Sequence, residues 1–101
     1  MAVTSQVSAD GTKLTIAIEG RFDFAKHQDF RKAYESVNHT PDSVVVDLKK
    51  TTYVDSSALG MLLLLRDHAG GDNSDIRVVN SSVDVRKILA ISNFDKLFDI
   101  S

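Results

Sequence analysis

Three polar residues, Asp55, Ser56 and Ser57, directly precede an apolar, leucine-rich run from Ala58 to Leu65. An Asp or Ser at the entry of a helix accepts hydrogen bonds from free backbone N–H groups, so we expect a helix to begin here. The N-terminus of a helix also favours negative charge. The position therefore suits an anion, or a hydroxyl that becomes one.

The roles of these three residues have alternatives. Ser56 could serve only as the N-cap of the helix, which contributes about 1 kcal/mol. Asp55 could be the cap instead, or a residue that a kinase recognises. Ser57 competes with Ser56 as a modification site, because adjacent helical side chains point about 100° apart and an enzyme would reach one better than the other.

The residues before this motif predict the element that positions it. The run from Val44 to Leu48 is short, β-branched and uninterrupted, which is typical of a central strand covered on both faces. A short polar turn then leads to Tyr53 and the helix start. On the helix, Leu64 lies opposite the face that Ala58, Leu62 and Leu65 share, so we expect Leu64 to be exposed.

Strands and helices alternate along the rest of the chain, which predicts an α/β fold. We expect a single domain over residues 1–101, with a mixed β-sheet of about four to five strands and helices packed against it. The expected strands are 3–8, about 13–19, 44–48, 76–79 and 97–100, with a hairpin turn at Asp10-Gly11. The expected helices cover about 25–37, the leucine-rich run up to Gly70-Gly71, and a segment that begins at Ser81 or Ser82 and packs through Val85, Ile88 and Leu89.

The strand, the polar turn and the sequence Asp-Ser-Ser-Ala-Leu-Gly before a Leu-rich helix closely resemble the STAS domain. This family includes bacterial anti-sigma-factor antagonists and the tail domains of transporters. Gly20-Arg21-Phe22-Asp23 is similar to the family's Gly-x-Leu-Asp element, and the tail from Ser82 to Phe98 to its closing helix and strand. Ala58 departs mildly from the family pattern, which often has Gly there.

The resemblance implies a regulatory protein that is phosphorylated on Ser56. In its unphosphorylated form it would bind a serine kinase of the anti-sigma-factor type, and phosphorylation would release the partner until a serine phosphatase restores the binding form. Phe22, Asp23, Asp55, Ser57 and Leu64 would contribute to the partner-binding surface. The protein would be substrate and ligand rather than enzyme.

Composition bounds the remaining possibilities. The chain of 101 residues has 43% hydrophobic and 26% charged residues and a formal net charge of −2, as in an ordinary soluble domain without affinity for nucleic acid. It has no cysteine, and its N-terminus lacks the features of a signal peptide. The longest apolar run is far short of the roughly 20 residues that span a bilayer. We therefore expect a cytoplasmic monomer that does not associate with membranes.

Enzymatic and metal chemistry has no local signature in the sequence. His27, His39 and His68 are scattered and show no ligand spacing, and Ser56 is not in a G-x-S-x-G elbow. Because no glycine-rich phosphate-binding loop occurs, ATP must come with the partner, and we expect no cofactor and no metal ion.

Two other interpretations remain open. Val44 to Leu48 superficially resembles the central strand of a phospho-aspartate receiver domain, with Asp47 as acceptor, although the acidic pair that holds Mg²⁺ in such domains is incomplete here. Alternatively, the chain is a constitutive interaction module that docks through Leu64 and its neighbours without phosphorylation.

Overall fold

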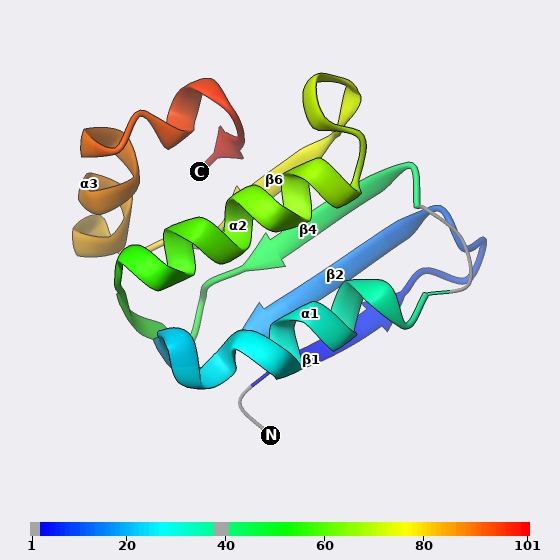
Figure 1. Cartoon of the computed structure of the whole chain (residues 1–101), viewed down its shortest axis with the longest axis horizontal. Helices are drawn as coiled ribbons and strands as arrows, with labels where there is room; N and C mark the ends of the chain where they lie inside the picture. Colours follow the sequence, from blue (N-terminus) through cyan, green and yellow to red (C-terminus); the bar gives the residue numbers. More distant parts are fainter. Residues whose placement is uncertain (1–2, 38–40) are drawn as a thin grey trace.

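Five strands form the main sheet in the order β1-β2-β4-β6-β7 in the computed structural model, which describes residues 3–37 and 41–101 (Figure 1). The strands are β1 (Val3–Val7), β2 (Lys13–Ile18), β4 (Ser43–Asp47), β6 (Ile76–Val79) and β7 (Asp99–Ile100). β1 pairs antiparallel with β2, and the other neighbours are parallel. The expected mixed sheet is confirmed.

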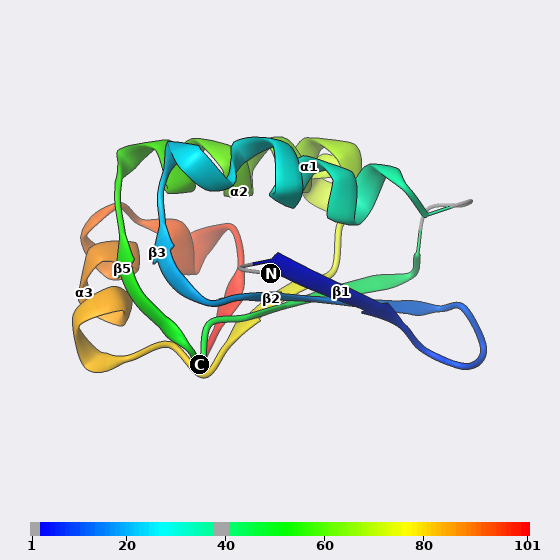
Figure 2. The ribbon, with the colours of Figure 1, turned by 90° about the horizontal axis from the view of Figure 1, so that it is seen from below.

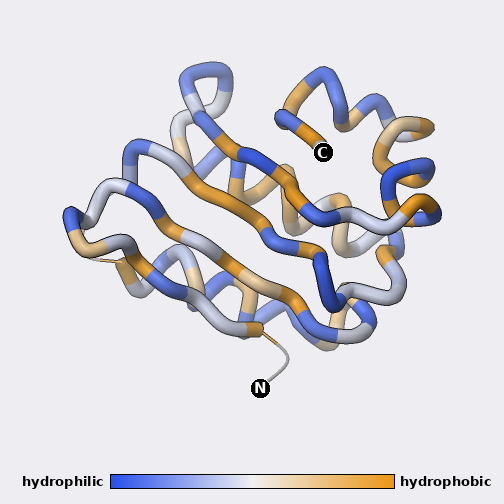
Figure 3. The backbone as a smooth tube through the Cα atoms, turned by 180° about the vertical axis from the view of Figure 1, so that it is seen from behind, coloured by the Kyte–Doolittle hydropathy of each residue, from blue (hydrophilic) through white to orange (hydrophobic). Residues whose placement is uncertain are grey.

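The helices α1 (His27–Glu35) and α2 (Ser56–His68) cover one face of this sheet, and α3 (Val83–Ile91) packs at one end of the molecule (Figures 1 and 2). The expectation that the central strand is covered on both faces was wrong. In β4, Val44 and Val46 are buried, whereas Val45 and Asp47 on the other face are only half-buried. Figure 3 shows this uncovered face of the sheet. An uninterrupted valine run does not report which face is open, because valine is favoured on any pleated surface.

The core lies between the sheet and the two helices that cover it. Its largest fully buried side chains come from nearly every element: Leu14, Ile16, Ile18, Phe22, Phe30, Val46, Leu48, Val54, Leu62, Leu65, Val78 and Leu89. No helix in the described part of the chain is long and apolar enough to cross a membrane.

A second, two-stranded sheet rises from the carboxyl end of the main sheet to the helix layer (Figure 2). Its strands β3 (Gly20–Phe22) and β5 (Thr51–Val54) are parallel. Gly20 adopts a φ of +85° where the chain leaves β2, and its N–H donates to the carbonyl of Lys50. The buried hydroxyl of Thr51 donates to the carbonyl of Ile18 at 2.8 Å and ties the small sheet to the main one. The sequence prediction treated the start of β5 as a turn.

Several boundaries differ from expectation. The segment predicted as one helix over about 25–37 is a 3-10 turn, η1 (Phe24–Lys26), followed by α1, which ends at Glu35. The last strand is only Asp99–Ile100, because a further 3-10 turn, η3 (Phe94–Lys96), precedes it; η2 (Gly71–Asn73) follows α2. Part of the predicted loop at 38–43 lies outside the described residues. The predicted start of α3 is confirmed, since the Ser82 hydroxyl caps it by accepting from the N–H of Val85.

Candidate functional site

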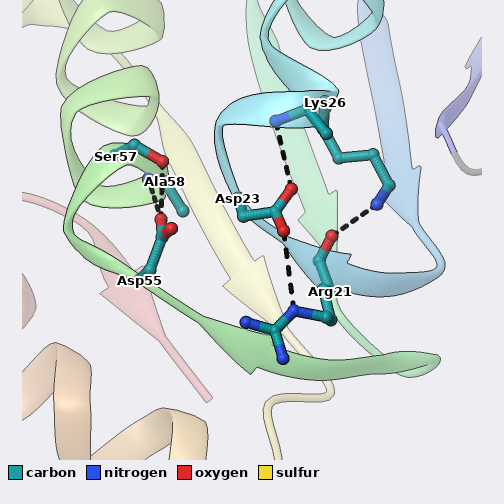
Figure 4. Close-up of polar contacts among 7 residues, drawn as sticks. Arg21, Asp23, Lys26, Asp55, Ser57 and Ala58 are labelled. Carbon is teal, nitrogen blue, oxygen red and sulfur yellow. Dashed lines mark hydrogen bonds and ion pairs between the residues drawn. The ribbon is translucent and has the colours of Figure 1, made fainter.

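Asp55 is the residue that caps α2. Its backbone is extended, and its side-chain Oδ1 accepts a hydrogen bond from the N–H of Ala58 at 3.0 Å (Figure 4). The interpretation of Ser56 as the N-cap was therefore wrong, and the alternative with Asp55 as cap is confirmed. A carboxylate caps well because it is ionised and lies at the positive end of the helix dipole.

The two serines that follow have different surroundings. The Ser57 hydroxyl is partly buried and donates to Asp55 Oδ1 at 2.6 Å (Figure 4). Ser56 is exposed, and its hydroxyl has no hydrogen-bond partner within residues 3–37 and 41–101. Of the two hydroxyls, the one at Ser56 is thus the more accessible to an enzyme.

These contacts hold Asp55 in its ionised form. The pKa of its carboxyl lies below the ordinary value of 3.8, chiefly because the Ser57 hydroxyl donates to it, then because the Ala58 N–H does, with a smaller contribution from the positive charge of Arg21. The entrance of α2 therefore carries a fixed negative charge beside the free Ser56 hydroxyl.

Asp23 is brought to the same place by the small sheet. In the parallel β3–β5 pair Phe22 lies opposite Val54, so both strands end together, each followed by an aspartate. The N–H of Asp55 donates to the carbonyl of Phe22 at 3.3 Å. Asp23 caps η1 by accepting from the N–H of Ala25. The two aspartates that the sequence analysis singled out thus both cap helical turns at one end of the molecule.

Arg21 and Tyr53 complete this end, and the sequence analysis assigned neither of them a role. They lie opposite each other in the β3–β5 register, with the Arg21 guanidinium carbon 4.8 Å from the centre of the Tyr53 ring. Arg21 also pairs with Asp23, its Nε lying 3.5 Å from Oδ2 (Figure 4). Their spacing could have indicated a role in the sequence, because Arg21 and Tyr53 each stand two residues before one of the two aspartates.

Comparison with known proteins identifies the chain. The sequence profile of a family described as "Mlab, STAS domain" matches residues 5–99. The chain belongs to the STAS domain family. A STAS-domain containing protein of Pseudomonas aeruginosa is 67% identical to it over the full length of both chains.

Solved structures show the same fold at low sequence identity. The structure of the anti-sigma factor antagonist SpoIIAA in its unphosphorylated form has a TM-score of 0.71 at 14% identity, covering 99% of this chain and 87% of that one. The Bacillus protein SpoIIAA in its phosphorylated form has a TM-score of 0.67, also at 14% identity, covering 99% and 91%. An anti-sigma factor antagonist from Mycobacterium paratuberculosis has a TM-score of 0.75 at 19% identity, covering 97% and 84%. This confirms the expected STAS fold.

One predicted surface residue of the STAS domain has to be corrected. Phe22 is 0% exposed and packs against Phe30, with 5.1 Å between the ring centres, so it belongs to the core and cannot contact a partner. Phe24, two residues further on, has an exposed aromatic side chain, which is 69% exposed and stacks on His27. The alternation of a strand places Phe22 inward and Arg21 outward.

The outer face of α2 extends from Ser56 along the helix. Leu64 is 53% exposed, as predicted, and Leu63 is also exposed. Gly60 lies between Ser56 and Leu64 on the same side, and a Cβ added to it would meet no atom within 4 Å. Ala58, the mild departure from the family pattern, is fully buried. Leu64 also lines a groove of about 260 Å³ between α1 and α2 with Arg31, Tyr34, Glu35 and His68.

Asp47 lies at the other end of β5 from this site. Its Oδ1 accepts from the N–H of Lys49 and from the side-chain amide of Asn80, so it organises the turn after β4. Within the described ranges, no three His, Cys, Asp or Glu side chains are close enough to share a metal ion. His27 and His68 contact the rings of Phe24 and Tyr34, and His39 lies outside the described residues.

Proposed function

We propose that this STAS domain is a phosphorylation-controlled regulatory binding protein of the anti-sigma-factor-antagonist type. With Ser56 unphosphorylated, it binds a serine kinase of the anti-sigma-factor type through the outer face of α2 and the neighbouring ends of β3 and β5. The kinase phosphorylates Ser56 and the complex dissociates, and a serine phosphatase restores the binding form. The domain acts as a monomer in the cytoplasm and is substrate and ligand rather than enzyme.

The observation that carries this proposal is the free hydroxyl of Ser56. It is exposed at the start of α2, while Asp55 performs the capping and Ser57 is engaged by Asp55. In the transfer, the Ser56 oxygen forms a bond to the γ-phosphorus of ATP as the bond to the ADP oxygen breaks, and the hydroxyl proton passes to a base on the kinase. ADP leaves. Among the described residues, no hydrogen bond has to break for this reaction.

The added phosphate changes binding more than it changes folding. It carries about −1.5 to −2 charges, and the N–H groups and dipole of the helix start tolerate an anion. A partner surface that fits the neutral hydroxyl of Ser56, however, has no group matched to the phosphate, and removing the phosphate from water against that surface is costly. Structures of SpoIIAA in its unphosphorylated and phosphorylated forms support the proposal that this fold can carry a phosphate.

The test begins with the partner. The tagged chain is purified from its native cells and co-purifying proteins are identified by mass spectrometry, after which the purified partner is incubated with the domain, ATP and Mg²⁺. We expect phosphate on the peptide that contains Ser56 in the wild type and in Ser57→Ala, and none in Ser56→Ala. Phosphate on Ser57 or Asp47, or on no residue, would contradict the assignment.

The exposed Leu63 and Leu64 favour a second candidate, a constitutive interaction module that docks through α2. Calorimetry with the same partner separates the two. Phosphorylation control predicts that Ser56→Ala binds like the wild type and that Ser56→Asp binds at least tenfold more weakly while remaining folded. Equal affinity of all three chains would support the constitutive module.

A further inference from the structure

Arg21 is a guanidinium at the entrance of α2, where its positive charge acts on Asp55, the residue directly before the proposed modification site. Its side chain is 66% exposed and contacts the Asp23 carboxylate and the face of the Tyr53 ring. Its positive charge also lowers the pKa of the Asp55 carboxyl. Lys26, the neighbouring cation, is held differently, because its Nζ donates to the backbone carbonyl of Arg21 at 2.6 Å.

The present partners of Arg21 hold it weakly. Its ion pair with Asp23 has a single long contact of 3.5 Å at the surface, and exposed pairs of this kind contribute little. Asp23 already has a second role as the cap of η1. The ring of Tyr53 offers no hydrogen-bond acceptor to the guanidinium from its face. An Arg side chain in this position can change partner readily.

A phosphate on Ser56 would be the stronger partner. Arginine presents a planar fork of donors that matches phosphate oxygens, and charge-assisted hydrogen bonds of this kind are about twice as strong as neutral ones. The β3–β5 register places Arg21 opposite Tyr53, and Tyr53 precedes Ser56 by three residues where β5 leads into α2. The positive charge of Arg21 already acts on Asp55, the residue directly before Ser56. The modified site would hold two negative groups, Asp55 and the phosphate, which need a cation between them.

We propose that Arg21 is the intramolecular ligand of phosphorylated Ser56, and that it leaves Asp23 and the Tyr53 ring to bind the phosphate. The unphosphorylated surface carries a free serine and a tyrosine that is 42% exposed and has a guanidinium over its ring. The phosphorylated surface carries a neutralised phosphate and an uncovered tyrosine. Phosphorylation thus replaces one docking surface with another rather than only blocking the first. This inference rests on the proposed modification of Ser56.

The experiment uses the full chain with phosphoserine installed at position 56 during translation, so that its outcome does not depend on any kinase. ³¹P NMR follows the second ionisation of the phosphate, whose ordinary pKa is about 6. Three charged groups share this end of the molecule with Arg21: Asp55 and Asp23, whose negative charges would raise this pKa, and Lys26, whose positive charge would lower it. We expect Arg21→Gln to raise it by about half a unit, and Arg21→Lys to restore part of the difference.

Arg77→Gln is the matched control, because Arg77 is an exposed arginine on β6 that pairs with Asp75 and Asp99 away from this end. Its phosphate should titrate like that of the wild type. The same pKa in Arg21→Gln and the parent would overturn the proposal, provided that thermal melting shows both to be folded. If the shift is present but native protein carries no phosphate on Ser56, the proposed function fails while the geometry stands.

A second measurement reports the release of Tyr53. The chain has two tyrosines and no tryptophan, so Tyr34→Phe leaves Tyr53 as the sole emitter. Acrylamide should quench the fluorescence of Tyr53 more strongly in the phosphoserine chain than in the unmodified chain. With Arg21→Gln, the phosphoserine and unmodified chains should be quenched equally. Equal quenching with Arg21 present would mean that the guanidinium stays on the ring, which would also overturn the proposal.

Discussion

At the start of α2, Asp55 caps the helix, whereas Ser56 presents an exposed hydroxyl. Asp55 satisfies the free N–H of Ala58, and Ser56 keeps its hydroxyl free. We therefore expect Asp55→Ala to lower the free energy of unfolding by about 1 kcal/mol, and Ser56→Ala to change it by less than about 0.5 kcal/mol. Urea unfolding of both variants measures this. A larger loss from Ser56→Ala than from Asp55→Ala would contradict the capping assignment.

The same contacts predict a dependence of stability on pH. The pKa of Asp55 is lowered in the folded protein, so its ionised form stabilises the fold at pH values above the unfolded pKa, and this contribution is lost as the pH falls through the folded pKa. Asp10, whose pKa is lowered from 3.8 to about 2 by the hydroxyls of Ser8 and Thr12, acts in the same direction in the β1–β2 turn.

Asp55→Asn isolates the contribution of this carboxyl, because Asn is a comparable cap that does not titrate. We expect the wild type to lose stability relative to Asp55→Asn as the pH is lowered from about 5 to about 2. Urea midpoints measured across this range test the prediction. Parallel curves for the two chains would show that the Asp55 carboxyl titrates alike in the folded and unfolded states.

At the scale of the element, the inner face of α2 packs in the hydrophobic core, whereas its outer face is exposed and does not contribute to the core. Gly60 on the outer face lies in open space, and a glycine inside a helix is about 1 kcal/mol less favourable than alanine. Gly60→Ala should therefore raise the unfolding free energy by up to about 1 kcal/mol. If a partner approaches this face closely, the same change should weaken binding. Calorimetry beside urea unfolding distinguishes the effects, and unchanged affinity would place the partner elsewhere.

Leu64 and Leu62 provide the matched pair for the two faces. Leu64 is exposed whereas Leu62 is fully buried, although only two positions separate them. Leu64→Glu should leave the melting temperature nearly unchanged and weaken partner binding, and Leu62→Glu should unfold the domain because it buries an unpaired charge. Circular dichroism melts and the same binding assay test this. An unfolded Leu64→Glu variant would place Leu64 in the core.

Helices were predictable from the sequence to the extent that their apolar spacing repeats. The inner face of α2 contains Ala58, Leu62 and Leu65, as the spacing predicted, and Gly70 ends the helix in a left-handed conformation. The strands β3 and β5 were not predicted, because three or four residues are too few for an alternating pattern to stand out. That omission hid the register that brings Arg21 to Tyr53. It also hid the strand alternation that buries Phe22, a residue assigned to the partner surface from the family resemblance.

At the scale of the whole molecule, the main sheet and the site are separable structures. The alternation of strands and helices predicted the α/β class, because each parallel strand needs a crossover. The site itself stands on the small β3–β5 sheet, above the carboxyl end of the main sheet (Figure 2). The open face of the main sheet could not be predicted from the sequence, since it depends on which side the crossovers cover.

This separation predicts that modification of Ser56 stays local. The Ser56 side chain is exposed and makes no hydrogen bond to another element among the residues that the structure describes. A phosphate there should therefore shift backbone amide resonances only in β3, η1, the end of β5 and the first turn of α2. The melting temperature should move by less than about 5 °C, which corresponds to roughly 1 kcal/mol in a domain of this size. NMR comparison of the chains with serine and phosphoserine at position 56 measures the amide shifts, and thermal melts of the two chains measure the melting temperature.

Phosphoserine at position 81 is the control, because Ser81 is buried and its hydroxyl donates to the carbonyl of Ser101. A phosphate there should destabilise the fold. Shifts that spread from Ser56 into β6 or α3 would mean that the switch acts through the core rather than at the surface.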